Sequence, residues 1–596
     1  MAGVGIRLCR PEELSDRQVR MAEQIFDTEI ASILAPLAVT SPDQFPPLAN
    51  QSLVIGVRLR TPGGSRYVVI PFGSSTPRLL TMYAEGGHAF LLLEDAVAMF
   101  VDRMFPNEEV LECLPFRITR HAEREVREDR AGDLIALLPD AAQDVPTNDC
   151  IRLEVDDRAT QAFIDFILAG SHVTTMCVFL IPGPIDLAGF APLYNLPGFE
   201  KHKYSAWPPQ APPDVNLAAS MFDTLSRRDI ILHHPYDSVD AVVRLVEEAA
   251  DDPDVVAIKQ TLYATDRDSP VVAALKRAAE NEKYVTAIIE LTPRFRDPPR
   301  LEWARALEQA SVQVIYGIRG LRTHAKLGII VRREPNGIQR YVHFGTGDYG
   351  QAAARLASDV SLLTNEEELG ADATDFFNAV TSHSYGRSFR MLDVAPSGLR
   401  IRLLDLIQTE KQRKLAGQKA FIKAKLNALG DRQIIEALYD AAKAGVRVLL
   451  NVCGFCCLRP GVPGLSDNIR VISIVDRFRE HSRILYFHNG GDERVFISTA
   501  DWTPRNLDRR VELLIPIRDP RARRRLIQIL NTYFRDNVKA AVLKSDGTYR
   551  RPKRGPNSKR VRSQEVLYQK AVAEVQRMEQ SRRTVFEPHK ASDTKR

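Results

Sequence analysis

Two stretches of the sequence, GLRTHAKLGII (residues 320–330) and EHSRILYF (residues 480–487), share one pattern. In each of them a histidine is followed two positions later by a basic residue, and an apolar run comes next. The two pairs are His324 with Lys326 and His481 with Arg483. Because the side chains of a β-strand alternate between its two faces, both members of a pair project from the same face. A single pair is either a solvated strand end or an anion site, and the local sequence does not decide between them.

The segments around each histidine alternate between strand and helix patterns. In the first half, strands are expected at 255–263, 284–291 and 312–318, and helices at 269–282 and 298–310. The first of these helices has Ser269 as its N-cap and Pro270 at its first position. In the second half, a helix is expected at 431–445 and strands at 446–454, 469–475 and 494–502. Alternation of this kind predicts a largely parallel sheet with helices on its faces.

The two halves also share landmarks in the same order. One alignment sets Lys259 against Lys425 and His324 against His481, and it sets FGTGDY (344–349) against ISTADW (497–502). The period is roughly 155–165 residues, which is far longer than a solenoid repeat. One recurring strand end is a plausible accident, but several features recurring in one order indicate a duplicated α/β domain.

The remaining sequence predicts further domains. A helix with Ser15 as N-cap and strands at 53–60 and 66–72 indicate a mixed α+β domain before a proline-rich boundary at 200–215. The expected domains are an α+β domain (1–205), two α/β domains (220–390 and 395–545) and a basic tail (546–596). The tail is expected to be partly disordered, with a short helix at 563–580. It either attracts polyanions such as RNA or only adds solubility.

Composition excludes several classes of protein. The chain has 596 residues, 44% of them hydrophobic and 26% charged, which is ordinary for a globular protein. No secretory signal and no membrane span is expected, so the cytoplasm is the predicted location. Seven cysteines do not make a disulfide framework in so long a chain. Cys453, Cys456 and Cys457 read as small apolar residues at a strand end, with metal binding as the alternative.

Two histidines in one cleft suit phosphoryl transfer. One imidazole can attack phosphorus while the other protonates the leaving oxygen. Cations must then hold the negative charge. The candidates near predicted strand ends are Lys259, Arg294, Lys326, Lys425, Arg459, Arg483, Arg505, Arg509 and Arg510. Any one of them alone is more often a surface ion pair, but the set beside two histidines favours a phosphate-rich ligand.

The layout is similar to that of the phospholipase-D-type hydrolases, which use two His-x-Lys-x4-Asp motifs. The positions for the aspartates hold Val331 and His488 here, and the second basic residue is Arg483. The hydrolase consensus is therefore not met. The fold expected is two tandem phospholipase-D-like α/β domains preceded by a mixed α+β domain, and a phosphodiesterase is kept as one alternative function.

The sequence resembles the long-chain polyphosphate kinases, which pass phosphate through a histidine. The similar stretches are LHHPYDSV (232–239), AIKQTLY (257–263), YGIRGLRTHAKL (316–327), YVHFGTGDY (341–349), CCLRPGVPGLSDNIRVISIVDRFREHSRILYF (456–487) and ISTADWTPRNLDRRVE (497–512). The resemblance extends from residue 5 to residue 550. It implies transfer of the terminal phosphate between ATP and inorganic polyphosphate, with ADP as the other nucleotide, Mg²⁺ as cofactor and a homo-oligomer as one possible assembly.

The resemblance also implies roles for individual residues. His324 would be the nucleophile that becomes phosphorylated, and His481 would be the second catalytic histidine. Arg294, in TPRFRD, would bind phosphate and the metal. The other cations named above would contact phosphate or nucleotide.

The chain departs from the family pattern at several positions. Ala264 and Cys453 stand where the family has phosphate-binding arginines, Ala357 replaces a nucleotide-contacting tyrosine, and Asp348 replaces an asparagine. An additional N-terminal helical domain of ~100 residues, within the ordinary domain range, is also expected to be missing. Each lost arginine removes a charge-assisted contact of about 1.5–3 kcal/mol. These departures support an alternative function, a non-catalytic paralogue that binds polyphosphate or nucleotide.

Overall fold

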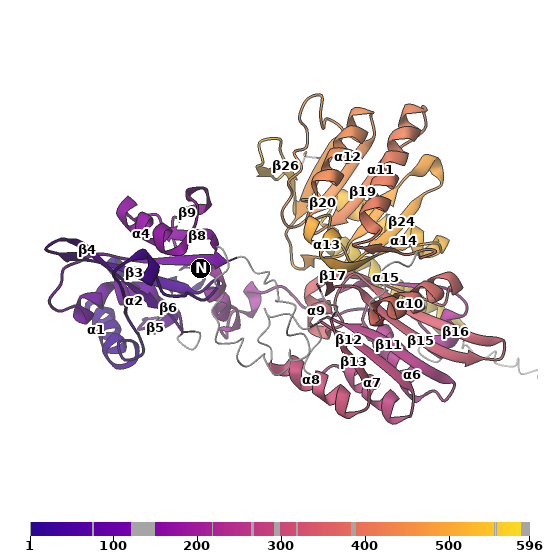
Figure 1. The fold of residues 1–596 in the computed structure, drawn as a ribbon, viewed down its shortest axis with the longest axis horizontal. Helices are drawn as coiled ribbons and strands as arrows, with labels where there is room; N and C mark the ends of the chain where they lie inside the picture. The colour runs from indigo at the N-terminus through magenta and orange to yellow at the C-terminus, as the bar shows by residue number, and fades with distance from the viewer. Residues whose placement is uncertain are drawn as a thin grey trace, which may run out of the picture. The chain divides into compact units, whose positions relative to one another are not determined.

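The computed structural model divides the chain into two compact units, Met1–Lys203 and Tyr204–Arg596 (Figure 1). The structure describes residues 2–73, 77–120, 150–216, 219–263, 268–290, 298–317, 320–382, 389–553, 555 and 557–585.

The first unit is a mixed α+β structure built on two sheets. One has the strand order β1-β6-β5 and the other has the order β2-β4-β3-β7-β8-β9. Its strands are β1 (Ile6–Leu8), β2 (Leu37–Val39), β3 (Leu53–Thr61), β4 (Gly64–Pro71), β5 (Leu79–Met82), β6 (His88–Leu92), β7 (Val110–Arg120), β8 (Cys150–Asp156) and β9 (Val178–Ile181). Its α-helices are α1 (Asp16–Ile25), α2 (Leu93–Phe100) and α4 (Gln161–Ser171). Ser15 caps α1 in a capping box with Gln18, which confirms the predicted helix start.

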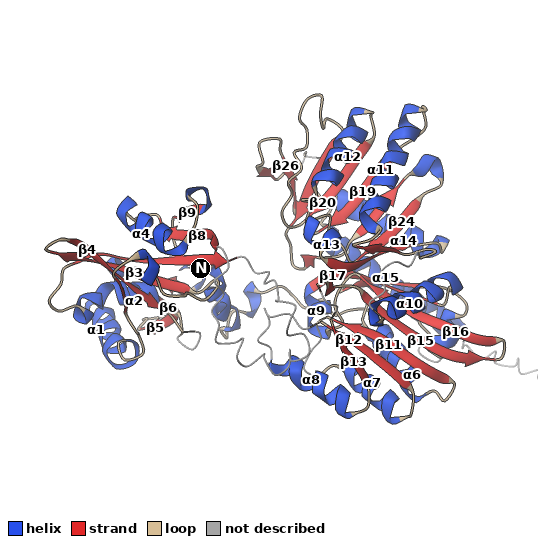
Figure 2. Cartoon of the chain, in the orientation of Figure 1, coloured by secondary structure: helices blue, strands red, loops and turns tan. Residues whose placement is uncertain are grey.

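The second unit begins with the first repeat, an α/β domain. Its strands are β10 (Ile230–His234), β11 (Val255–Leu262), β12 (Tyr284–Ile289), β13 (Gln313–Tyr316), β14 (Arg322–Thr323), β15 (Lys326–Glu334), β16 (Gly337–Gly345) and β17 (Ala357–Thr364). Its helices are α5 (Met221–Leu225), α6 (Asp240–Asp251), α7 (Pro270–Glu280), α8 (Pro298–Gln309), α9 (Gln351–Leu356) and α10 (Glu367–Thr381). Helices α6 and α7 pack on one face of the sheet and α10 on the other (Figures 1 and 2).

The second repeat has the same plan. Its strands are β18 (Asp393–Ala395), β19 (Phe421–Leu426), β20 (Arg447–Val452), β21 (Ile469–Ile474), β22 (Arg479–Glu480), β23 (Ile484–Phe487), β24 (Arg494–Ser498), β25 (Arg510–Pro516), β26 (Ala540–Leu543) and β27 (Tyr549–Arg550). Its helices are α11 (Leu399–Leu415), α12 (Arg432–Lys443), α13 (Pro504–Asp508), α14 (Pro520–Phe534) and α15 (Ser563–Val585). The strand order β25-β24-β23-β19-β20-β21 repeats the order β17-β16-β15-β11-β12-β13 of the first repeat. The expected duplication of an α/β domain is therefore confirmed.

The expectation of a largely parallel sheet was wrong. Among the described strands within each repeat, only β11, β12 and β13, and their counterparts β19, β20 and β21, pair in parallel. The strands that follow each histidine pair antiparallel, as β15 does with both β11 and β16. The reason is local. Strands β15 and β16 are joined by a two-residue turn, Pro335 and Asn336, and a short turn can only return the chain antiparallel.

The two repeats exchange short strands. Strand β14 of the first repeat pairs with β25 of the second, and β22 of the second pairs with β17 of the first. One hydrophobic core also contains residues from both repeats, such as Leu327 and Phe376 of the first and Ile484 and Leu513 of the second. The strand exchange carries the start of each histidine segment onto the sheet of the other repeat.

The basic C-terminal segment is more ordered than expected. Instead of a short helix, α15 is 23 residues long. Leu567 and Ala571 of this helix are buried in the core that the repeats share, and Arg562 pairs with Asp476. This part of the predicted tail is therefore a structural element of the second unit.

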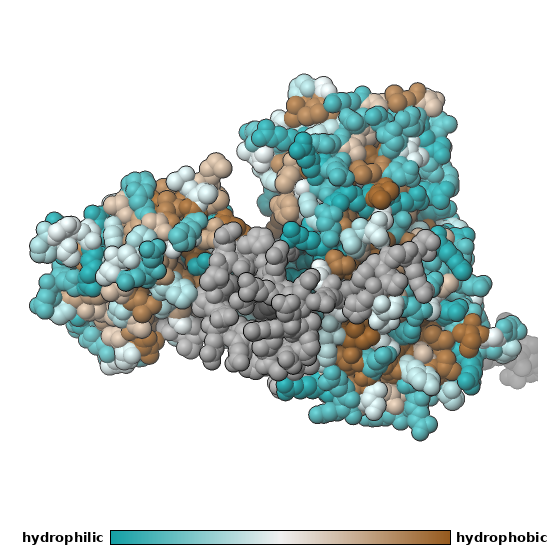
Figure 3. All heavy atoms as spheres, in the orientation of Figure 1, coloured by the Kyte–Doolittle hydropathy of each residue, from teal (hydrophilic) through white to brown (hydrophobic). Residues whose placement is uncertain are grey.

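No helix among the described residues is long and apolar enough to cross a bilayer. Figure 3 shows apolar side chains scattered among polar ones on the visible face. The seven cysteines are free thiols, and no group of three potential metal ligands occurs in the described part of the chain.

Candidate active site

His324 lies between β14 and β15, where the first repeat meets β25 of the second. Its backbone N–H donates to the carbonyl of Val511, and its Nδ1 lies 2.9 Å from the Oε2 of Glu512. The ring stands edge-on to Tyr263, with 4.8 Å between the ring centroids. The ammonium of Lys326 lies 4.6 Å from the centre of the same Tyr263 ring. His324 and Lys326 therefore project from one face, as the two-residue spacing predicted.

His481 has the corresponding arrangement, but the first repeat supplies its carboxylate partner. Its Nδ1 lies 2.9 Å from the carboxylate of Asp359 on β17, and its Nε2 lies 3.2 Å from Nη1 of Arg483. A guanidinium has only donors, so Nε2 must be the acceptor and Nδ1 must carry the proton. Arg483 is itself anchored by Asp501 at 2.9 Å. His481 is therefore a neutral imidazole with both nitrogens engaged.

Each histidine thus takes its carboxylate partner from the other repeat. The sequence analysis missed both partners, Glu512 and Asp359, since they lie 188 and 122 residues from their histidines. A signal was present. Each is a single acidic residue at the start of an apolar run, DVSLL (359–363) and ELLIP (512–516), and these runs occupy corresponding strands of the two repeats.

Burial sets the charge state of both rings. It lowers the pKa of His324 well below its usual range, and the cations Lys326 and Arg510 act in the same direction. Burial also lowers the pKa of His481, although Asp359 opposes this. Arg483 acts on His324 and Lys326 acts on His481, so the two histidines share one electrostatic environment. Both rings are neutral at pH 7, as an attacking nitrogen must be.

Two buried cationic donors beside His324 are unused. Lys326 Nζ and Arg510 Nε have no hydrogen-bond partner among the described residues. Burial lowers the pKa of Lys326, and Asp348, with an oxygen 3.4 Å from Nζ, opposes that change. Buried polar groups are nearly always satisfied, so a cluster of unsatisfied donors indicates a place for an anionic ligand.

The side chains of Lys425 and Lys259 are bound to protein groups other than the two histidines. Lys425 is fully buried and pairs at 3.1 Å with Glu480, which is equally buried. Lys259 donates to Asn378 of α10 at 3.4 Å. The charge of Lys425 is matched within the protein, and Lys259 points toward α10.

The proposed alignment of Lys259 with Lys425 was wrong by two residues. Lys259 pairs in register with Ile329, five residues after His324. Lys423 pairs with Tyr486, five residues after His481. Lys423 also donates to an asparagine of α14, Asn531, as Lys259 donates to Asn378 of the corresponding helix α10. Register therefore makes Lys423 the counterpart of Lys259.

Three of the other predicted phosphate-binding residues lie on the surface. Arg459, Arg505 and Arg509 are exposed, and the carbonyl of Arg509 accepts a hydrogen bond from the N–H of Arg322 in β14. Arg294 and Ala264 lie outside the described residues.

Two of the family departures lie within the described residues. Ala357 is the first residue of β17, paired with Arg479. The Cys453 thiol contacts the side-chain amide of Asn427 at 3.1 Å, and burial raises its pKa, so it is a poor nucleophile.

Glu290, at the end of β12, is a further buried acid near His324. Its Oε2 accepts the backbone N–H of Thr323 at 2.8 Å, and burial raises its pKa from 4.5 to about 7. The folded state favours the protonated form, so the stability it contributes is complete below pH 4.5 and is lost as the pH rises through 7. We expect Glu290→Gln to flatten the fall in unfolding free energy between pH 5 and pH 8, measured by urea denaturation. The exposed Glu280→Gln is the control, and an unchanged slope in Glu290→Gln would contradict this assignment.

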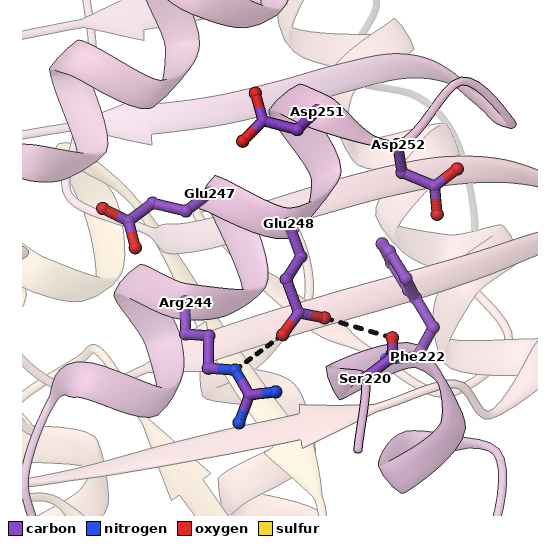
Figure 4. Close-up of a pocket in the computed structure, with 7 residues that line it drawn as sticks. All are labelled: Ser220, Phe222, Arg244, Glu247, Glu248, Asp251 and Asp252. Atoms are coloured by element: carbon purple, nitrogen blue, oxygen red, sulfur yellow. Dashed lines mark hydrogen bonds and ion pairs between the residues drawn. The ribbon is translucent and has the colours of Figure 1, made fainter. Parts of the chain in front are cut away.

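One pocket of the second unit is not part of this site. It lies along α6 and is lined by acidic residues, and Figure 4 shows Glu248 bonded to Arg244 and Ser220. Its two aspartates pair with arginines outside the figure, Asp251 with Arg277 and Asp252 with Arg332. Three of its four carboxylates therefore have partners of their own, and the pocket offers no set of unused cations like the one beside His324.

Comparison with known proteins agrees with this geometry. Family models match residues 17–193 (polyphosphate kinase middle domain), 220–386 (polyphosphate kinase C-terminal domain 1) and 392–564 (polyphosphate kinase C-terminal domain 2). A polyphosphate kinase of Rhodopirellula baltica is 47% identical over 99% of this chain and 72% of its own length. One of Halalkalibacterium halodurans is 40% identical over 95% and 81%.

A solved structure gives the same result. The crystal structure of polyphosphate kinase from Porphyromonas gingivalis superposes with a TM-score of 0.79 at 29% identity, covering 97% of this chain and 86% of that one. The chain therefore belongs to the polyphosphate kinase family.

Proposed function

We propose that the protein moves the terminal phosphate between ATP and inorganic polyphosphate through a phosphohistidine at His324. The observation that carries the proposal is the pair of buried cationic donors beside His324, Lys326 Nζ and Arg510 Nε, neither of which has a hydrogen-bond partner among the described residues. A tetrahedral phosphoryl group on Nε2 supplies acceptor oxygens for such donors. Membership of the family supports the same reaction.

The nucleophile is the Nε2 of His324. Glu512 accepts a hydrogen bond from Nδ1–H, which keeps the proton on Nδ1 and leaves the lone pair on Nε2. This lone pair attacks the γ-phosphorus of ATP, a P–N bond forms, and the P–O bond to ADP breaks with its electrons staying on ADP. A terminal oxygen of polyphosphate then attacks the phosphohistidine, the P–N bond breaks, and neutral His324 is restored. Lys326 and Arg510 hold the charge of the equatorial oxygens.

His481 carries the proton in this scheme. A neutral imidazole accepts a proton from an attacking phosphate oxygen once Arg483 turns from Nε2 to the phosphate. Asp359 stabilises the resulting imidazolium. Although burial opposes ionisation, His481, Thr346 and Arg483 hold the pKa of Asp359 below its usual range, so this carboxylate is charged.

The site fits a magnesium ion that arrives bound to the phosphate substrate. Mg²⁺ is usually bound by one or two carboxylates together with substrate phosphates. Asp348 is half-buried beside Lys326, and its Oδ1 has no hydrogen-bond partner in the described part of the chain. Asp348 would hold the ion, which supplies charge neutralisation for the transferring phosphate, and Arg294, as the resemblance implies, would contact the phosphate that carries the ion. The exposed basic residues between Arg550 and Arg560 are the proposed contact for longer polyanions.

The test is a two-way assay. Purified protein with Mg²⁺ and ATP should lengthen polyphosphate, and with ADP and polyphosphate it should form ATP. A protein that binds polyphosphate but performs neither reaction would support the alternative, a non-catalytic paralogue, which the alanine at Ala357 and the thiol at Cys453 favour. Cleavage of a phosphodiester instead would indicate the hydrolase.

A further inference from the structure

The loop that follows β16 brings a negative charge to the anion site. Asp348 places Oδ1 3.4 Å from the ammonium of Lys326, and neither atom has a hydrogen-bond partner among the described residues. The Lys326 side chain is 1% exposed and that of Asp348 is 24% exposed. Both atoms of the ion pair are therefore buried, but the rest of the Asp348 side chain reaches solvent.

The same loop also supports the other histidine. The carbonyl of Thr346 accepts from Arg483 at 3.1 Å, and its hydroxyl donates to Asp359 at 2.6 Å. A side chain at Gly347 would collide with the Asp359 carboxylate, so the glycine permits this close approach. Any shift of the loop would disturb the Asp359–His481 pair.

A chain of buried hydrogen bonds holds the end of this loop, at Tyr349, against strands β16, β17 and β10. It links Tyr349, His343, Ser361 and His234 through three contacts of 3.0 Å, and His234 Nδ1 ends it on the carbonyl of Asp237 at 3.0 Å. A carbonyl only accepts, so Nδ1 of His234 carries a proton and its Nε2 accepts from Ser361. By the same logic His343 donates to Ser361 and accepts from Tyr349. Each hydrogen bond in the chain therefore has a defined donor and acceptor, and the chain holds Tyr349, the residue next to Asp348, in place.

We propose that Asp348 is a specificity-determining residue, a built-in counter-ion that makes the site select phosphates that arrive with a divalent cation. This inference rests on the proposed function, because it concerns the same phosphate site. In the empty site Asp348 balances Lys326. When phosphate oxygens approach Lys326, the carboxylate becomes a like charge beside them, and the anchored loop cannot withdraw it. A divalent cation between the phosphate and Asp348 converts that repulsion into attraction.

The test measures binding rather than turnover. Isothermal titration calorimetry with inorganic tripolyphosphate is run once with EDTA and once with excess Mg²⁺. The wild type should bind the magnesium complex at least about tenfold more tightly than the free anion. Asp348→Asn should bind the free anion at least about tenfold more tightly than the wild type does, and its preference for the complex should collapse. Asp348→Ser removes the same charge with a smaller side chain, and it should show the same two changes in affinity as Asp348→Asn.

The matched control is Asp405→Asn on α11, where the lost carboxylate pairs with Arg402 in the second repeat. It changes the net charge equally and should keep the wild-type ratio. Equal ratios in Asp348→Asn, Asp348→Ser and wild type would overturn the inference while leaving the phosphate site in place. A wild type that binds tripolyphosphate under neither condition would instead overturn the proposed function.

Discussion

Replacing His324 by glutamine should abolish labelling of the protein by γ-labelled ATP, whereas His481→Gln should retain the label and lose turnover. The two imidazoles differ in one contact. Nε2 of His481 accepts from Arg483, but the described residues place no hydrogen-bond partner on Nε2 of His324. Only His324 offers a lone pair for attack. Loss of a covalent nucleophile costs at least ~10⁴-fold in turnover.

The label itself identifies the bond. A phosphohistidine is labile in acid and stable in alkali, so the label on wild type should be lost on acid treatment only. His481→Gln is the matched control, since it removes another largely buried imidazole with a carboxylate partner. Label on His324→Gln, or none on His481→Gln with labelled wild type, would reverse the assignment of the two rings.

The sequence predicted the parts of the site that depend on local geometry. The spacing of His324 and Lys326 required one shared face, and both side chains contact Tyr263. Ser269 caps α7, with Pro270 at its first position, because both residues act on the adjacent helix turn. Local rules of this kind need no knowledge of the tertiary fold.

The carboxylates could not be assigned in this way. Glu512 reaches His324 because β14 pairs with β25, and that pairing belongs to the packing of the two repeats. The single acidic residue at the start of ELLIP marks Glu512 as a candidate, but without that pairing the sequence does not show which histidine it contacts. The misplaced Lys425 has the same origin, since its counterpart is defined by register across the sheet and not by the letters beside it.

Glu512→Gln is expected to lower the rate of His324 phosphorylation by about 10²–10⁴-fold, although it changes only one atom. Asn506 determines this outcome. Its Oδ1 accepts the hydroxyl of Thr503 at 2.7 Å, so its amide nitrogen must face Glu512. A glutamine at 512 would then turn its oxygen to Asn506 and its NH₂ group to Nδ1 of His324. Nδ1 would become the acceptor, the proton would move to Nε2, and the attacking lone pair would be lost.

Asp359→Asn is the matched control, because its surroundings have the opposite logic. The neighbour of Asp359 is the Thr346 hydroxyl, a donor, so the asparagine can keep its oxygen toward both Thr346 and Nδ1 of His481. The tautomer of His481 is preserved, and its loss in labelling rate should be much smaller. Rapid-quench labelling with ATP measures both rates, and ¹⁵N chemical shifts of the imidazoles report the tautomers. Equal losses in the two variants, with His324 still protonated at Nδ1, would mean that Glu512 acts through its charge and not by orienting the ring.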